Sequence, residues 1–296
     1  SLCCAIDSRN VRMTKRIPRK ALNLVPTALA VATALLYLSS NGYSASQRSG
    51  PVLRAATKLV APNSAMVGSA ITATMTGAAK PGSRNDEAEA RTARAIDVLK
   101  PAVRQLSHPD ALRDAFQSYF TFASEHPDQV RKPYLYFVDY GLSSITPRGY
   151  VFDMSTLKIV DGPFMVAQGR GSATNARGIP THFSNAFGAA TTSLGLYVAQ
   201  ELYKFTGHAG GEAYHSIGLR LAGVSGGFND NARARGVVAH GAPYVTDTRA
   251  GRSEGCPAMA PARARELLPK LASGGLVFLF APDSNWMSHD PWLSAD

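Results

Sequence analysis

The chain has 296 residues, of which 45% are hydrophobic and 18% charged, an ordinary globular composition for one or two domains. Its formal net charge is +10, but residues 1–46 hold six of the 31 basic residues and one of the 21 acidic ones, which leaves a net of +5 for the rest. This excess is mild and no zinc-finger, homeodomain or RNA-recognition signature accompanies it, so no nucleic-acid partner is expected.

The N-terminal segment, residues 1–46, has the pattern of an export signal. Basic residues within Lys15–Lys20 precede the apolar run Ala21–Leu38, and the small polar residues Ser39–Ser46 follow as a site for cleavage. An uncleaved membrane anchor is the alternative, because the apolar run approaches spanning length. Met13 is the expected true start. The protein is therefore expected to be exported to the periplasm or cell envelope, and to meet a membrane only through this segment.

The three cysteines divide between the export segment and the rest of the chain. Cys3 and Cys4 lie in or before the signal, so the exported part holds Cys256 alone. A single cysteine cannot form an internal disulfide, which leaves it as buried filler or as a reactive thiol.

A linker and a helical region follow the export segment. Residues 47–86 are rich in Ala, Ser, Gly and Thr without an apolar period, which predicts a flexible linker. Within residues 87–132, apolar residues recur at steps of three and four, which predicts helices. His108–Pro109 breaks the first helix, and Asp110 is placed to cap the second.

Residues 133–282 have a β-rich pattern, and residues 283–296 are expected to be a C-terminal tail. We expect turns at Ser143–Pro147 and Asp161–Gly162, and a helix at Ala260–Leu271 interrupted by Pro269. Short aromatic and β-branched runs predict seven strands: Tyr134–Tyr140, Gly149–Met154, Phe164–Gln168, Thr192–Ala199, Gly218–Ala222, Val237–His240 and Leu276–Ala281. The fold class is therefore mainly β, a sandwich of mixed strands preceded by a small helical region.

A histidine and a cysteine in this β-rich part form a candidate catalytic pair. An apolar strand ends at His240, Gly241 lets the chain turn, and Cys256 follows sixteen residues later in Ser253-Glu-Gly-Cys. An imidazole that takes the thiol proton makes the sulfur nucleophilic, and Gly255 frees backbone N–H groups to face an oxyanion. The alternative is coincidence, because one such pair occurs by chance in many proteins and a lone cysteine is often simply buried.

The His-Gly…Ser-x-Gly-Cys arrangement resembles the signature of L,D-transpeptidases with the YkuD-type fold. The sequences of the motifs around these residues are most similar to those of the murein L,D-transpeptidase catalytic domain family. Short sequence motifs similar to those of that family occur in the same order over roughly residues 134–282. They are Val151–Met154, Phe183–Asn185, Ser193–Tyr197, Gly218–Leu221, Phe228–Asp230, Val238–Ala242 and Gly251–Pro257. The resemblance implies a YkuD-like β-sandwich.

The resemblance also implies roles for individual residues. Cys256 would be the acylated nucleophile and His240 its general base. Ser253 would help to orient the histidine, partly through its backbone carbonyl, and Gly255 and Cys256 would supply oxyanion N–H groups. The sequence departs from the broad family at Glu254, where a histidine is common.

A second departure follows the cysteine. Pro257–Ala258 stands where the family has an apolar residue and then Arg or Asn, and the missing side chain could help to bind a substrate carboxylate. Arg252 or Arg220 is a possible stand-in. His215, before the Leu219–Leu221 strand, and His182, in a segment that resembles one bordering the family's cleft, are further candidates for substrate binding beside Gly241.

The implied reaction is acyl transfer on peptidoglycan stem peptides through a thioester on Cys256. An amine acceptor makes the enzyme an L,D-transpeptidase that forms 3→3 cross-links, whereas water makes it an L,D-carboxypeptidase, and the sequence leaves both open. Inhibition by carbapenems through acylation of Cys256 is expected, and no metal or organic cofactor is required.

Two other classes of function remain open. The first is a non-catalytic peptidoglycan-binding or scaffold protein with the same fold. The second is a zinc-dependent hydrolase with ligands drawn from His182, His215, His240 and Cys256, although the sequence has no HExxH or CxxC pair.

Overall fold

The computed structural model describes residues 84–293, and residues 1–83 and 294–296 lie outside the described part. The expected export signal or anchor at residues 1–46 therefore lies outside it, as does the expected linker except for its last three residues, which belong to a helix. Within residues 84–293, no helix is both long enough and apolar enough to cross a membrane.

Two helices form at the N-terminal end of the described chain. Helix α1 spans Arg84–Leu99 and continues into a 3-10 turn, η1, at Lys100–Ala102, and α2 spans Ala111–Glu125. Each buries one face, as the apolar period predicts. Asp110 occupies the N-cap position of α2, but its carboxylate makes no capping hydrogen bond.

Eight strands form one mixed sheet in the order β3-β2-β1-β10-β5-β6-β7-β9, and β4 pairs with β8 in a second, two-stranded sheet. The strands are β1 Tyr134–Asp139, β2 Gly149–Asp153, β3 Lys158–Phe164, β4 Gln168–Gly169, β5 Gly195–Ala209, β6 Glu212–Gly223, β7 Val238–Gly241, β8 Arg252–Ser253, β9 Ala258–Met259 and β10 Leu276–Phe280. The β1–β10, β7–β9 and β4–β8 pairs are parallel and the other pairs are antiparallel. The mainly β fold of mixed strands, preceded by helices, is thus confirmed.

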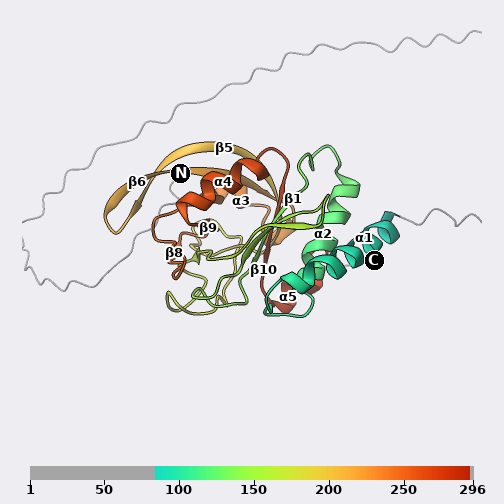
Figure 1. Ribbon diagram of the computed structural model, residues 1–296. Helices are drawn as coiled ribbons and strands as arrows, with labels where there is room; N and C mark the ends of the chain where they lie inside the picture. The colour runs from blue at the N-terminus through green and yellow to red at the C-terminus, as the bar shows by residue number, and fades with distance from the viewer. Residues whose placement is uncertain (1–83, 294–296) are drawn as a thin grey trace, which may run out of the picture. The chain divides into compact units, whose positions relative to one another are not determined.

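The two faces of β1 pack against different layers, because successive side chains of a strand point to opposite faces. On one face, Phe137 and its neighbour Phe152 of β2 lie in contact, and Phe116 of α2 packs edge-on against Phe152 with ring centroids 5.3 Å apart. On the other face, Tyr136 stacks on Phe164 of β3 at 5.9 Å. Helix α4 (Pro261–Leu271) lies toward this second face, close to the β5–β6 hairpin (Figure 1).

Two expectations near the C-terminus need correction. Pro269 does not interrupt α4, which continues to Leu271 because Leu268 and Leu271 are buried in the core. The expected tail at residues 283–296 contains a short helix, α5 (Ser284–His289), whose Trp286 is 1% exposed. The indole Nε1 donates to the Asp290 carboxylate at 2.7 Å, which satisfies the polar edge of this buried ring.

One strand prediction and one turn prediction were also wrong. The strand expected at Phe164–Gln168 does not exist as such, because Phe164 ends β3 and β4 begins only at Gln168. The turn expected at Asp161–Gly162 lies inside β3, where the β2–β3 register shifts and Gly162 has φ +138°. Asp and Gly are typical of turns, but they also occur at irregular positions within a paired strand, and the sequence pattern does not distinguish the two.

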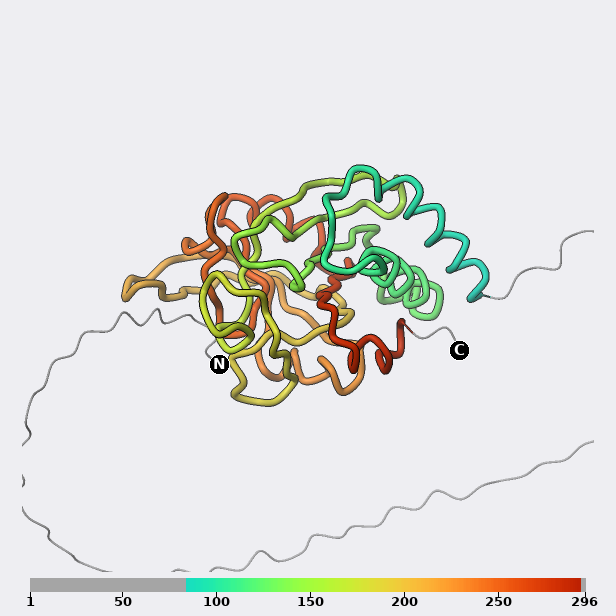
Figure 2. Tube along the Cα trace, turned by 90° about the horizontal axis from the view of Figure 1, so that it is seen from below, coloured from blue at the N-terminus to red at the C-terminus, as the bar shows by residue number. Residues whose placement is uncertain are grey.

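The β5–β6 hairpin is much longer than the strands predicted at Thr192–Ala199 and Gly218–Ala222. Its strands pair as far as Ala209 and Glu212 and are joined by Gly210–Gly211, both with positive φ, as a two-residue hairpin turn requires. The outer half was missed although Tyr203–Ala209 alternates apolar and polar residues, with the apolar ones partly or fully buried and the polar ones exposed, as in a strand with one covered face. The hairpin projects on the side away from α1 and α2 (Figures 1 and 2).

Candidate active site

Strand β7 carries His240 between two neighbouring strands. His240 is paired with Gly218 of β6 on one side and with Ala258 of β9 on the other. Its backbone N–H donates to the carbonyl of Pro257 at 3.2 Å, so the residue that follows Cys256 is hydrogen-bonded to the main chain of the histidine. The parallel β7–β9 pairing therefore brings the His-Gly and Ser-x-Gly-Cys segments together, as their spacing predicts.

The His240 imidazole is buried and lies among aromatic rings. His240 is 2% exposed. The Phe205 ring lies edge-on to the imidazole, with the centroids of the two rings 5.5 Å apart. Nδ1 lies 3.1 Å from the Gly241 carbonyl, which can only accept, so this contact favours the tautomer with the proton on Nδ1 and a basic Nε2. Burial lowers the pKa of His240 to about 4, against a smaller opposing effect of the Gly241 carbonyl. The ring is therefore neutral near pH 7.

A tight turn holds the main chain on either side of the cysteine. The Ser253 hydroxyl donates to the Cys256 carbonyl at 2.7 Å and accepts from the Gly255 N–H at 3.2 Å. Gly255 has φ +124°, and a Cβ at this position would lie 2.7 Å from the Thr191 carbonyl oxygen. Only glycine fits this turn without strain.

The contacts of Ser253 and Gly255 differ from those that the family resemblance implied. The Ser253 carbonyl accepts from the Arg170 N–H at 2.7 Å, and the partner of the His240 ring is Gly241 instead. The Gly255 N–H points to the Ser253 hydroxyl rather than into open space. In this arrangement Ser253 shapes the Cys256 turn through two hydrogen bonds.

Cys256 is 1% exposed and is not in a disulfide within the described residues. Tyr140, at the end of β1, lies close enough to interact electrostatically with it. Burial raises the pKa of Tyr140 well above its usual value, with a further contribution from Cys256, and its hydroxyl donates to the Ala167 carbonyl at 3.0 Å. A fully buried tyrosine thus lies within electrostatic range of the thiol.

A buried arginine supports the segment beside the cysteine. Arg148 donates to the Val166 carbonyl at 2.8 Å, to the Leu142 carbonyl at 2.6 Å and to the side chain of Gln168, and its guanidinium lies 4.7 Å from the centre of the Tyr140 ring. Burial lowers its pKa to about 10, so it remains charged at neutral pH.

The segment that leads into β4, to which Arg148 is hydrogen-bonded, pairs with the chain on both sides of the cysteine turn. Gln168 and Gly169 pair with Arg252 and Ser253 on β8, and Ala167 bridges to Ala258 on β9. Arg148 was not found from the sequence, because it stands at the edge of an expected turn and its partners are distant in the chain. No local pattern signals that it is buried.

The two arginines considered for carboxylate binding have different environments. Arg252 lies on β8, half-buried, with its backbone paired to Gln168. Arg220 on β6 forms an ion pair with Glu201 at 3.1 Å and lies 4.3 Å from the centre of the Tyr203 ring. Glu254, at the position where the family often has histidine, pairs with Arg170 at 2.8 Å. Arg220 is thus engaged on the β5–β6 hairpin.

The remaining candidate histidines do not form a cluster with His240. His215 on β6 contacts the Thr206 hydroxyl at 3.1 Å, and His182 contacts its neighbour Thr181 at 3.1 Å. Among residues 84–293, no group of three or more His, Cys, Asp or Glu side chains could hold a metal ion. The four residues suggested as zinc ligands are therefore not assembled into a site in the described chain.

A comparison with protein-family models matches the part of the chain that holds His240 and Cys256. The model of the L,D-transpeptidase catalytic domain family matches residues 104–280. This range is more than half of the chain and contains both residues. No curated protein matches the chain by sequence.

The comparison with solved structures finds L,D-transpeptidases at low identity and with low TM-scores. The L,D-transpeptidase from Mycobacterium smegmatis is 13% identical, with 51% of this chain and 59% of that chain covered and a TM-score of 0.31. The L,D-transpeptidase LdtMt1, solved in complex with imipenem, is also 13% identical. The match covers 50% of this chain and 59% of that chain, with a TM-score of 0.32. The one from Stackebrandtia nassauensis is 15% identical, with 71% and 97% covered and a TM-score of 0.30. The chain thus spans about three-fifths of the length of the first two.

Proposed function

Because the chain belongs to the family of L,D-transpeptidase catalytic domains, we propose that it is a cysteine acyltransferase acting on peptidoglycan stem peptides. The observation that carries this proposal is the parallel pairing of β7 with β9. It bonds the His240 N–H to the Pro257 carbonyl, next to Cys256. A neutral imidazole on β7 and a thiol in the turn that leads into β9 are groups that thiol-based acyl transfer uses.

In the first half of the reaction, His240 Nε2 takes the proton of the Cys256 thiol. The sulfur then attacks the carbonyl of the amide that joins the third stem residue to the terminal D-Ala. The C–N bond breaks, and His240 returns the proton to the leaving amine, so D-Ala departs and a thioester remains. The lowered pKa of His240 keeps the ring neutral before the attack and favours return of the proton to the leaving amine, although it weakens the ring as a base for the thiol.

In the second half, an amine of another stem or a water molecule attacks the thioester. His240 takes the proton of this nucleophile, the C–S bond breaks, and the proton passes to the sulfur. The amine yields a 3→3 cross-link and water yields a tripeptide. Neither path consumes a cofactor, because acyl transfer from amide to thioester to product is balanced without one.

Substrate access requires a change in the covering segments, since Cys256 is 1% and His240 is 2% exposed. Tyr244, in the segment between β7 and β8, lies with its ring centroid 6.5 Å from that of His240. The Thr191 carbonyl lies against Gly255 from the other side. Movement of the segment that carries Tyr244 would open the imidazole to a stem peptide.

The same burial favours a second candidate function, a non-catalytic peptidoglycan-binding protein with this fold. Alkylation of Cys256 by iodoacetamide at pH 7 separates the two. We expect alkylation faster than that of a free cysteine at this pH and a strong decrease in His240→Gln. A rate no faster than that of an unactivated thiol, and equal in the two proteins, would favour the binding protein.

The decisive test is mass spectrometry of tetrapeptide muropeptides incubated with the purified protein. We expect loss of D-Ala, as tripeptide or as cross-linked dimer, and a decrease of about 1,000-fold or more in Cys256→Ala, because the nucleophile is removed. Thermal unfolding of the variant should remain close to that of the parent. Equal turnover by both proteins would contradict the proposal.

Carbapenem acylation provides a test that is independent of the natural substrate. We propose that a carbapenem adds to Cys256, and intact mass should then rise by the mass of one inhibitor in the parent but not in Cys256→Ala. An unchanged mass after prolonged incubation would count against an activated thiol.

The proposed substrate lies outside the cytoplasm, so we propose that the protein acts in the cell envelope. The basic block and apolar run at residues 15–38 support export or anchoring. Subcellular fractionation with a C-terminal epitope would test this: we expect the chain with the cell-envelope fraction, and recovery in the cytoplasm would contradict it.

A further inference from the structure

The loop of residues 184–193 lies against the turn that carries the cysteine. It contains no helix or strand, so no ladder of backbone hydrogen bonds fixes its position. The Ser184 N–H donates to the Thr192 carbonyl at 3.1 Å, which closes the loop on itself. The Thr191 carbonyl oxygen would lie 2.7 Å from a Cβ on Gly255, the residue before the nucleophile. The position of the turn therefore depends on what holds this loop.

The guanidinium of Arg235 binds the 184–193 loop at four places. Nη1 donates to the Ser184 carbonyl at 2.9 Å and to the Ser193 hydroxyl at 2.5 Å. Nη2 donates to the Ala189 carbonyl at 3.0 Å and to the Thr191 carbonyl at 3.1 Å. A planar guanidinium presents its N–H groups in fixed directions, which suits it to join acceptors from separate parts of a loop. Arg235 thus connects both ends of the loop with its middle.

The two arginines of helix α3 (Ala232–Arg235) have different environments. Arg233 is exposed and pairs with Glu201 at 2.8 Å. Arg235 is half-buried, and none of the ion pairs within residues 84–293 includes it. Its four hydrogen bonds are charge-assisted, and such bonds are stronger than those between neutral groups. Arg233 thus belongs to the surface, whereas the charge of Arg235 supports the loop.

Arg235 lies in the same short stretch of chain as the base. It is the last residue of α3, and Gly236 then turns the chain with φ +76°. Strand β7 follows and carries His240, five residues after Arg235. The packing of this one stretch therefore fixes both the guanidinium and the imidazole.

This stretch holds the cysteine turn on both sides of the thiol. After the cysteine, the His240 N–H donates to the Pro257 carbonyl at 3.2 Å. Before it, Arg235 holds the Thr191 carbonyl that lies against Gly255, and its own Nη2 would lie 3.8 Å from a Cβ on that glycine. Loss of the guanidinium would remove the support before the thiol and keep the one after it.

From this arrangement we infer that Arg235 is a positioning residue for the proposed acyl transfer. By holding the 184–193 loop against Gly255, it fixes the turn before Cys256 and so places the thiol relative to His240. The inference rests on the proposed function, because it concerns that same site. Arg235 takes no chemical step itself, since bond formation and proton transfer stay with Cys256 and His240.

The first test separates placement of the thiol from binding of the substrate. D-Ala release from tetrapeptide muropeptides is measured as kcat and KM for the full chain, Arg235→Ala and Arg235→Lys. We expect kcat to fall about 100-fold in Arg235→Ala with KM within about threefold, because a displaced nucleophile slows the chemical step. Arg235→Lys should lose about tenfold, since an ammonium keeps the charge but lacks the two-armed fork. A kcat of Arg235→Ala within about twofold of the parent would overturn the inference, as would a loss confined to KM.

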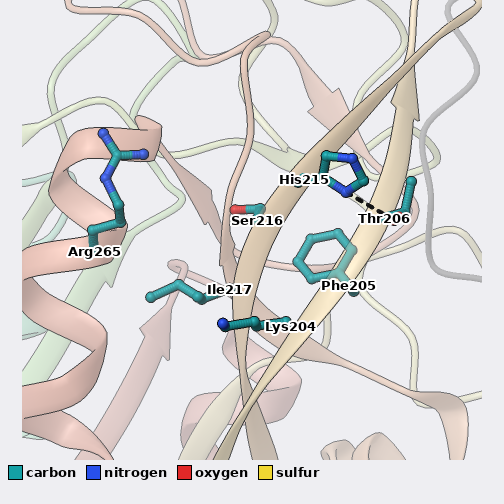
Figure 3. A pocket seen from close by; sticks show the side chains of 7 residues that line it. All are labelled: Lys204, Phe205, Thr206, His215, Ser216, Ile217 and Arg265. Carbon is teal, nitrogen blue, oxygen red and sulfur yellow. Dashed lines mark hydrogen bonds between the residues drawn. The ribbon is translucent and has the colours of Figure 1, made fainter.

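Two variants control for the loss of a positive charge. Arg233→Ala removes the neighbouring arginine of α3, whose partner is Glu201. Arg265→Ala removes a cation of α4 that lines, with Lys204, a groove of about 490 Å³ (Figure 3). The β5–β6 and β6–β7 registers put Lys204 on the face of the sheet opposite to the His240 ring. Both controls should have the kcat of the parent, and a decrease in either that equals that of Arg235→Ala would overturn the inference.

A further control covers the case in which Arg235→Ala does not fold. Arg235→Lys is then compared with Phe116→Leu, which weakens the packing of α2 against Phe152 and leaves the cysteine turn unchanged. Thermal unfolding establishes a temperature at which both variants are folded. We expect kcat to fall in Arg235→Lys alone. Equal losses in the two variants would mean that lowered stability reduces turnover, and would overturn the inference.

Alkylation of Cys256 separates failure of this inference from failure of the proposed function. The rate with iodoacetamide is measured at pH 7 and at pH 9, and the ratio of the two rates largely cancels differences in access to the thiol. An ordinary thiol has a pKa near 8.5, so the ratio is small without an assisting base and larger with one. We expect the ratio to fall about tenfold in Arg235→Ala and to stay at the parent value in Arg233→Ala.

The two kinds of failure then give different results. If the parent releases no D-Ala, the proposed function fails, and a lower alkylation ratio in Arg235→Ala would still support placement of the thiol by this arginine. An equal ratio in the parent and in Arg235→Ala would overturn the inference, whether or not D-Ala is released.

Discussion

The two faces of the sheet around β1 bury different kinds of side chain. The face toward α2 is packed by aromatic rings, with Phe116 edge-on to Phe152 and Phe137 beside it. The face toward α4 and the cysteine buries polar groups, including Tyr140 and Arg148. One strand thus separates a layer that stabilises the fold by apolar burial from a layer that holds desolvated polar groups beside the thiol.

Buried polar atoms without a hydrogen-bond partner occur on both sides of the sheet, since Asp114 and Gln117 of α2 each leave one side-chain oxygen unpaired within the described chain. Arg148 is hydrogen-bonded to two carbonyls and to Gln168, yet Gln168 Nε2 and the Tyr136 hydroxyl lack a hydrogen-bond partner within the described chain. Buried polar atoms without partners cost stability and are retained most often where chemistry needs them. We therefore expect substitutions on the two faces to separate stability from reactivity.

The largest effect on stability is expected on the apolar face. Phe116→Ala removes a fully buried ring and should lower the free energy of unfolding by about 3–5 kcal/mol. Urea unfolding measures this change, and Phe116→Leu should lose clearly less. The carbapenem acylation rate of the folded variant should remain that of the parent. A large decrease in that rate would break the separation between the faces.

The next effect concerns His240 and depends on pH. The unfolded chain binds a proton near pH 6.5 but the folded protein only near pH 4, so stability from the neutral buried ring is present above pH 6.5 and is lost as the pH falls to about 4. This loss amounts to about 3 kcal/mol. Asp114, whose pKa burial raises to about 7, acts in the opposite direction, because its protonated form is favoured in the folded state.

Comparison with His240→Gln isolates the histidine from the carboxylates. The difference in unfolding free energy between parent and variant should change by about 3 kcal/mol between pH 7 and pH 4, with the parent losing more. Urea unfolding at several pH values measures it. A difference that stays constant with pH would mean that the ring is not desolvated in solution.

A smaller effect on stability, with a large effect on reactivity, is expected at Gly255. Gly255→Ala places a Cβ at φ +124° and 2.7 Å from the Thr191 carbonyl, and should cost about 1–3 kcal/mol while displacing Cys256. Its matched control is Gly227→Ala, because a Cβ there meets nothing within 4 Å. Thermal unfolding and carbapenem adduct formation measure the two consequences. Normal adduct formation in Gly255→Ala would show that the turn geometry does not position the thiol.

The smallest effect is expected where the polar face meets solvent. Arg263 of α4 pairs with Asp161 of β3 at 2.5 Å, but the two side chains are 26% and 29% exposed. Arg263→Ala should therefore lower stability by less than about 1 kcal/mol and leave acylation unchanged. Urea unfolding at low and high salt measures it. A loss of several kcal/mol would place this pair among the buried groups of the site instead.

The positions of most helices and strands could be predicted from local pattern. The three- and four-residue period predicted α1 and α2, and short runs of aromatic and β-branched residues predicted β1, β2, β7 and β10. The failures lie where pairing, not composition, decides the structure. The outer part of the β5–β6 hairpin is largely exposed, and its length depends on the pairing of the two strands as far as Ala209 and Glu212.

For the candidate site, the sequence by itself determined which residues can do the chemistry, because Cys256, His240 and the glycine turn are close in the chain and carry their reactivity in their own side chains. Tertiary structure alone decided that the thiol is closed to solvent, that Tyr140 lies within electrostatic range of it, and that Arg148 packs on the Tyr140 ring. It also brought Lys204 and Arg265 together beside α4, on the face of the sheet opposite to the His240 ring. Burial, pKa and the sharing of a groove depend on contacts between residues far apart in the chain, and no local pattern encodes them.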